Sequence, residues 1–195
     1  MKYRSIEKNT RPVFWLLTIS AGSTITQLTL ALYNINNLWT LHGYLFFELP
    51  LSVYAYSLWV REIPTRIILR AIAVGYLVFW ALAKTIFESY LGPATYSAPV
   101  SRILLVVTSI YSLYHIASET ETELINDTRF WFIATSIVFG AGSAMFAALQ
   151  GLIGQQSPEI ILRVYNIYWT FIVFINLGYS WALLCKPIPQ TSGGH

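Results

Sequence analysis

Charged side chains are scarce in this sequence, because only 11% of its 195 residues are Asp, Glu, Lys or Arg while 55% are hydrophobic. A soluble domain of this length cannot hide so much apolar surface from water. The mean hydropathy of +0.55 agrees with this reading. The composition therefore excludes an ordinary soluble domain and indicates a membrane protein.

Cysteine and the common catalytic motifs are also missing. Cys185 is the single cysteine, so no internal disulfide can form. The sequence has no HExxH motif, Cys/His cluster, Walker loop or nucleophile elbow. His42 and His115 fall at opposite ends of their apolar segments, too far apart to ligate one haem. We therefore expect no catalytic residues, no metal and no cofactor, and we do not expect an enzyme.

Long apolar runs, in contrast, fill the sequence. Six segments have about the 20 residues that a helix needs to cross a hydrocarbon core of about 30 Å. They are residues 12–33, 39–60, 67–91, 99–117, 130–153 and 158–185. Because the connections are too short to fold alone, we predict one all-α domain over residues 1–195, a polytopic transmembrane bundle of six helices.

Basic residues occur only in alternate connections. The first, third and fifth connections contain no Lys or Arg. The other side of the bundle carries Lys2, Arg4, Lys8, Arg11, Arg61, Arg66, Arg129 and Lys186. The positive-inside rule therefore predicts a multi-pass protein of the inner membrane with both termini in the cytoplasm. The net charge of +3 reflects this topology, and we expect no nucleic-acid partner.

Glu48 stands near the middle of the second segment, two residues before Pro50. An ionisable side chain at that depth is costly unless it has a partner or water, so it marks a functional site by default. Pro50 cannot donate a hydrogen bond to the carbonyl of Phe46, and we expect a bend there. Glu48 is therefore the first candidate for a binding residue.

Other ionisable side chains gather in the predicted outer half of the membrane, namely His42, Lys84, Glu88, Arg102 and Arg163. In one interpretation, Lys84 and Glu88 form an i,i+4 ion pair and the arginines reach the lipid headgroups. In the other, Lys84, Arg102 and Arg163 line an outward-facing polar cavity with Glu48 at its floor. Three cations against two carboxylates would then favour a small anionic or zwitterionic ligand.

The fifth segment carries a run of small residues, Gly140-Ala141-Gly142-Ser143, followed by further alanines. Small side chains let two membrane helices approach closely. The run therefore predicts a packing face first and a hinge second.

The plan of six helices with short loops, His42 and Glu48 in the second helix, and a fifth helix that begins Phe130-Trp131-Phe132-Ile133 before Gly140 resembles a known group. It is similar to the small six-helix bacterial membrane proteins that accompany sensor histidine kinases, and to the membrane regions fused to such kinases. The resemblance implies a sensory or accessory role. The sequence stops shortly after the last helix, so any kinase would be a separate protein.

We therefore expect an integral inner-membrane sensory or accessory protein, a receptor that binds a small ligand near Glu48 and signals to a partner through its helix ends. Its expected partners are the lipid bilayer and either a membrane protein or a separate histidine kinase. A small proton-coupled transporter that uses Glu48 is one alternative. A structural subunit of a larger membrane complex is another.

Overall fold

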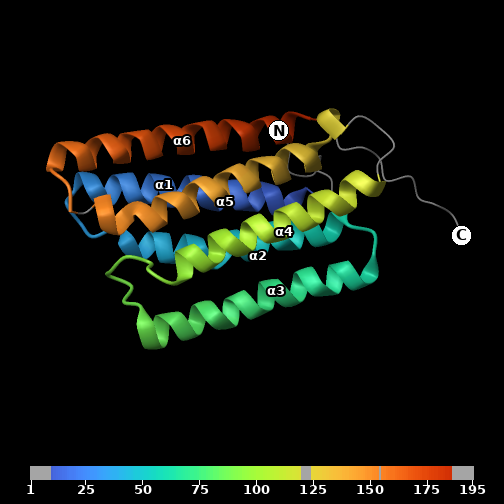
Figure 1. Cartoon of the computed structure of the whole chain (residues 1–195), viewed down its shortest axis with the longest axis horizontal. Coiled ribbons are helices and arrows are strands. Elements are labelled where there is room, and N and C mark those ends of the chain that lie inside the picture. Colours follow the sequence, from blue (N-terminus) through green and yellow to red (C-terminus); the bar gives the residue numbers. More distant parts are fainter. Residues whose placement is uncertain (1–9, 120–123, 154, 186–195) are drawn as a thin grey trace, which may run out of the picture.

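The computed structural model of the protein is a bundle of long α-helices that run side by side (Figure 1). It describes residues 10–119, 124–153 and 155–185, and these ranges contain no β-strand. The long helices are α1 (Arg11–Leu32), α2 (Leu38–Trp59), α3 (Ile63–Leu82), α4 (Ser97–Glu119), α5 (Thr128–Ile153) and α6 (Pro158–Leu184). The prediction of an all-α bundle is confirmed.

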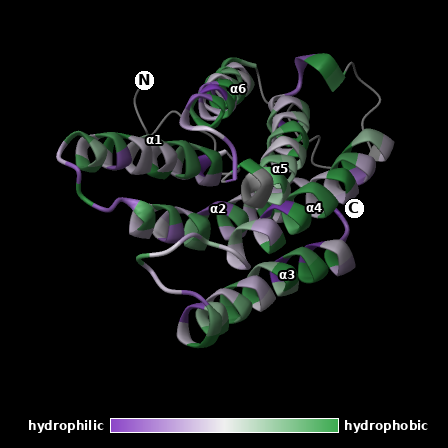
Figure 2. Cartoon of the chain, turned by 60° about the vertical axis from the view of Figure 1, so that its left-hand side comes forward, coloured by the Kyte–Doolittle hydropathy of each residue, from purple (hydrophilic) through white to green (hydrophobic). Residues whose placement is uncertain are grey.

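Five of the six helices are long and apolar enough to cross a membrane, which indicates a multi-pass membrane protein. The exception is α2, which has 22 residues but carries His42, Glu48 and Pro50. α2 packs against α1, α3 and α4, and more of its residues are buried than in α1 or α3. Figure 2 shows it between α1 and α3. Because neighbouring helices cover it, α2 can carry polar groups that a lipid-facing helix could not.

The third helix differs most from its prediction of residues 67–91. It begins at Ile63, because Pro64 falls in the first turn, where the missing N–H of proline costs nothing. It ends in a π-helical turn, η2 (Ala83–Phe87), in which the N–H of Glu88 donates to the carbonyl of Ala83 at 2.8 Å. The chain then leaves the helix four residues earlier than expected.

Two other helix starts lie two residues earlier than predicted. α4 begins at Ser97 instead of residue 99, and α5 begins at Thr128 instead of residue 130. At the start of α5, the Asp127 carboxylate accepts a hydrogen bond from the N–H of Arg129 at 2.8 Å, which satisfies one free donor of the first turn. A short 3₁₀ turn, η3 (Leu124–Asn126), precedes it.

α2 continues as an α-helix through Pro50.

The small residues of α5 allow close helix packing, as predicted. A Cβ atom at Gly140 would lie 2.7 Å from Val106 Cγ2 and 3.2 Å from the carbonyl oxygen of Arg102 on α4. A Cβ atom at Gly142 would lie 2.5 Å from the ring of Phe171 on α6. Gly140 therefore sets the approach of α4 to α5 directly beside Arg102.

Candidate functional site

Glu48 lies halfway along α2 and is only 2% exposed. It forms an ion pair with Arg102 of α4, whose Nη1 donates to Glu48 Oε2. The guanidinium also lies over the ring of Phe139 on α5, with 4.3 Å between Cζ and the ring centroid. The pair therefore connects α2 with α4 inside the bundle and also contacts α5.

The second carboxylate oxygen of Glu48, Oε1, is buried and has no hydrogen-bond partner within the described part of the chain. An unsatisfied buried acceptor costs about 1–3 kcal/mol, and more when it is charged. Such atoms are rare in native proteins, so each one needs an explanation. Glu48 Oε1 is the position at which this site can accept a proton or a donor group from a ligand.

Three phenol groups lie near the ion pair. Tyr44, Tyr76 and Tyr179 lie within electrostatic range of both Glu48 and Arg102. Tyr76 donates its hydroxyl proton to a backbone carbonyl of α2 at 3.2 Å. Because a hydroxyl can donate or accept a hydrogen bond, these side chains can stabilise more than one charge state of the pair.

A second buried network lies where the α3–α4 connection meets α2, and we call it the loop network. Lys84 Nζ forms an ion pair with Glu88 and donates to Ser97 Oγ at 3.0 Å. It also donates to His42 Nδ1 at 2.5 Å, which places the proton of a neutral imidazole on Nε2. His42 Nε2 then donates to the carbonyl of Gly92 at 2.9 Å. The network thus holds the connection against α2.

The π-helical turn η2 places Lys84 and Glu88 in this network. Such turns are uncommon and appear mostly as single bulges, frequently at functional sites. Glu88 follows the turn in an extended conformation, with φ −125° and ψ 130°. From there its carboxylate reaches back to Lys84 and forward to the first turn of α4.

Glu88 caps α4 from outside the helix. Its Oε1 accepts hydrogen bonds from the N–H of Tyr96 and from the N–H of Ser97, the latter at 2.7 Å. A negative charge at a helix N-terminus is favourable because it faces the positive end of the helix dipole. Burial alone would raise the pKa of Glu88, but the hydrogen bonds from Lys84, Ser97 and Tyr96 lower it to about 2. Glu88 is therefore an ionised structural carboxylate.

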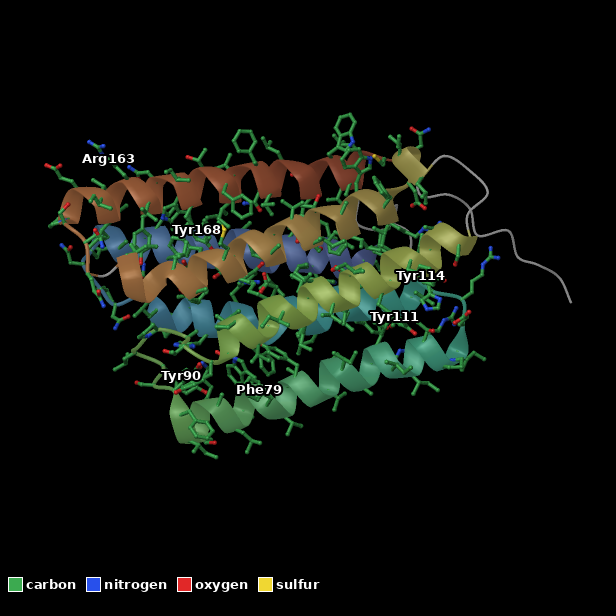
Figure 3. The ribbon with its side chains drawn as sticks, viewed as in Figure 1. Phe79, Tyr90, Tyr111, Tyr114, Arg163 and Tyr168 are labelled. Atoms are coloured by element: carbon green, nitrogen blue, oxygen red, sulfur yellow. The ribbon has the colours of Figure 1, made fainter. Side chains whose placement is uncertain are left out.

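Two aromatic rings cover the loop network. Lys84 Nζ lies 5.7 Å from the centroid of the Trp80 ring, a distance typical of a cation–π contact. Tyr90 packs edge-on against His42, with 5.9 Å between centroids, and also contacts Trp80. Figure 3 shows Tyr90 just beyond the end of α3. Lys84 and Glu88 are accordingly 8% and 7% exposed.

Neither network resembles a metal centre. Over residues 10–119, 124–153 and 155–185, no three His, Cys, Asp or Glu side chains gather where they could hold a metal ion. No family model, curated protein or solved structure matches this chain. The two buried networks are therefore the basis for a functional proposal.

Five of the six candidate site residues belong to the two networks. Glu48 pairs with Arg102, while His42, Lys84 and Glu88 lie together in the loop network. The ion pair predicted between Lys84 and Glu88 is present. Arg163 lies on the exposed side of α6 and points away from both networks (Figure 3).

An open pocket lies at the other end of the bundle, near the end of α6. It is lined by Asn126, Trp181, Leu184 and Cys185. Lys84 and Arg102 are both buried and both paired with carboxylates. A cavity with Glu48 at its floor stays a prediction, and it requires a state of the bundle in which these pairs separate.

Sequence reasoning missed several groups that complete the two networks. They are the Ser97 hydroxyl, the Gly92 carbonyl, the Tyr96 N–H and the Phe139 ring. Ser97 had a readable signal, because a serine two residues before Pro99 is typical of a first helical turn. The Gly92 carbonyl had none, since any residue supplies that atom.

Proposed function

We propose that the protein is a sensory or accessory protein of the membrane, and that the Glu48–Arg102 pair is the contact that a ligand changes. The observation that carries this proposal is Glu48 Oε1, a buried carboxylate oxygen without a partner among the described residues, next to a buried guanidinium. Membrane proteins keep such costly groups inside the bilayer mainly where they serve function.

The chemistry of the pair favours a small zwitterionic ligand. The ammonium group of such a ligand would donate to Glu48 Oε1, and its carboxylate would accept from the guanidinium of Arg102, which has five N–H donors. An anionic ligand would use Arg102 alone and leave Glu48 in need of a proton. The ligand therefore replaces the contact between the two side chains with two contacts of its own.

Ligand binding at the pair would separate α2 from α4. The two side chains are 2% and 6% exposed, so a ligand must open the α2–α4 interface to reach them. A ligand shifts a conformational equilibrium only through its different affinity for the two states. In the open state, Glu48 and Arg102 are each available to the ligand, whereas in the closed state the two side chains bind each other. The movement would reach a partner protein, such as a separate histidine kinase, at the helix ends.

The proposal includes six membrane crossings with both termini on the cytoplasmic side of an inner membrane. Five crossings follow from helix length and hydropathy, and α2 supplies the sixth. On the predicted cytoplasmic side, Arg61 lies between α2 and α3, and Arg11, Arg66 and Arg129 lie in the first turns of α1, α3 and α5. Lys2, Arg4, Lys8 and Lys186 lie outside the described residues.

Native mass spectrometry tests the proposal, with the protein extracted in mild detergent from the membrane of the organism that makes it. Wild type is compared with Glu48→Gln and with Glu62→Gln, a control acid whose side chain is 57% exposed. We expect a small bound mass in wild type and in Glu62→Gln that is lost in Glu48→Gln. A spectrum with no bound mass and no co-purifying chain in any variant would contradict the proposal.

A proton-coupled transporter is the second candidate, because the same unpartnered oxygen of Glu48 can hold a proton near Tyr44, Tyr76 and Tyr179. Uptake into proteoliposomes distinguishes the two functions. A transporter would accumulate solute in a pH-dependent way that Glu48→Gln abolishes. A receptor would bind its ligand in the same vesicles without uptake.

A further inference from the structure

The outer face of α6 carries a regular seam that the bundle leaves uncovered. Residues that alternate by three and four positions, as in a coiled-coil heptad, are exposed along the whole helix. We call the set the α6 seam, and it comprises Leu162, Asn166, Trp169, Val173, Asn176 and Ser180. Only 6% of the most apolar stretch of α6 is buried, against 39% for α4 and for α5.

Two carboxamides make this seam unsuitable for contact with lipid. Asn166 and Asn176 lie about 8 Å to either side of the centre of a 27-residue helix, within the hydrocarbon core. The hydroxyls of Thr170 and Ser180 bond to backbone carbonyls of α6 itself. A carboxamide has two donors and an acceptor. Among the described residues, Asn176 donates to the carbonyl of Ile172, and this bond leaves its oxygen available.

α1 is nearly as exposed as α6, but no carboxamide is exposed on its surface. Its carboxamide, Gln27, is half-buried and donates to Ser23 at 3.0 Å. Its exposed threonines, such as Thr18 and Thr29, bond to carbonyls one turn earlier in the helix. Of these two exposed helices, α6 is therefore the one whose surface carboxamides need a partner outside the bundle.

We propose that two copies of this chain associate in parallel through the α6 seam, so that Asn166 and Asn176 of one copy hydrogen-bond to the same residues of the other. Copies inserted with one topology place each asparagine at the same depth as its equivalent. A carboxamide is self-complementary because it donates and accepts, and asparagine at a heptad core position is known to fix register and oligomeric state.

The depths of the two asparagines support a second copy as the partner. Asn166 and Asn176 lie equally far from the centre of α6, and both are exposed. A copy inserted with the same topology presents a carboxamide at each of these two depths, so both asparagines are paired at once.

Disulfide cross-linking in vesicles tests the dimer, because a single replacement, Cys185→Ala, removes the only cysteine. In that background, Val173→Cys places a thiol on the seam, and Phe174→Cys places one at the same depth about 100° around the helix. The two side chains are 58% and 65% exposed, so they are matched in access. We expect oxidation to produce a covalent dimer from Val173→Cys and only background dimer from Phe174→Cys.

The asparagines are tested by adding Asn166→Leu and Asn176→Leu to the Val173→Cys protein. Both positions are exposed, so leucine there leaves the fold of the monomer intact. We expect the association constant of the copies in vesicles to fall about tenfold, for two lost polar contacts. Equal cross-linking at positions 173 and 174, or an unchanged association constant after the two leucine replacements, would overturn the proposal. So would a different protein found cross-linked to Val173→Cys in native membranes.

Discussion

At the scale of single residues, the Glu48–Arg102 pair predicts an asymmetric effect on stability. Arg102→Gln leaves the Glu48 carboxylate buried without a cation, and we expect it to lower the free energy of unfolding by about 3–5 kcal/mol. Replacing both residues, as Glu48→Leu with Arg102→Met, removes both desolvation costs and should recover most of that loss. Unfolding in mixed detergent micelles measures each variant.

The double replacement also separates stability from function. A variant that is as stable as wild type and yet loses the small bound mass would show that the pair is kept for binding. If the double replacement were as unstable as Arg102→Gln, the two side chains would not be acting as a pair.

Residue types and spacing predicted part of this site. Glu48 was marked by its depth, and Lys84 and Glu88 by their i,i+4 spacing, and the structure buries all three. The pairing of Glu48 with Arg102 was beyond the sequence, because the two residues are 54 positions apart and the rotation of each helix depends on packing. The same holds for His42, whose partners come from η2 and from the α3–α4 connection.

Glu88 predicts a specific loss of stability in acid. Its pKa is about 2 in the folded protein, against an ordinary value of 4.5, so the unfolded chain takes up the proton first as the pH falls. The stabilisation from Glu88 is therefore complete above pH 4.5 and is lost between about pH 4.5 and pH 2.

Thermal unfolding of wild type and Glu88→Gln over this pH range checks the prediction. We expect the difference in stability between the two proteins to be largest near neutral pH and to shrink as the pH approaches 2. Glu62→Gln, at an exposed acid, should follow wild type throughout. A constant difference between wild type and Glu88→Gln would show that hydrogen bonding to a neutral side chain suffices at this position.

At the scale of helices, the α4–α5 contact predicts opposite outcomes for two Gly→Ala replacements. Alanine favours a helix over glycine by about 1 kcal/mol, so Gly75→Ala, where no atom lies within 4 Å of the new Cβ, should be neutral or slightly stabilising. Gly140→Ala should destabilise by about 1–3 kcal/mol, because its Cβ meets Val106 and the Arg102 carbonyl. Unfolding midpoints of the two variants make the comparison.

Hydropathy located the helices well but predicted their ends less well. α1, α2 and α6 begin and end within one residue of the predicted segments. The third helix was predicted to continue to residue 91 because the polar and apolar residues at 88–91 follow an order that a helix could also have. The helix ends earlier because the Glu88 carboxylate accepts a hydrogen bond at the N-terminus of α4. This contact joins two separate elements, so the hydrophobic periodicity of one segment cannot predict it.

At the scale of the whole molecule, composition predicted the class of protein, while the arrangement of helices came from the structure. An 11% charge content is incompatible with a soluble fold of this size. Hydropathy alone would suggest that α2 is the helix least suited to the membrane, but the structure places it among α1, α3 and α4. The one long helix that falls short of the hydropathy of a membrane span is thus packed among these neighbours, so its lower hydropathy reflects its position in the bundle.

Hydropathy supports a membrane crossing for each long helix except α2. The last prediction therefore tests whether α2 crosses the membrane. In a Cys185→Ala background, Ile35→Cys and Glu62→Cys place thiols just before and just after α2. If α2 crosses the membrane, an impermeant maleimide labels Ile35→Cys from the outside and Glu62→Cys only from the cytoplasmic side. Wild-type Cys185 should label from the cytoplasmic side too, at mildly alkaline pH, because burial and the nearby Asp127 raise the pKa of its thiol. Labelling of positions 35 and 62 from one side would mean that α2 does not span the bilayer, and Glu48 would then lack the membrane depth on which its proposed role depends.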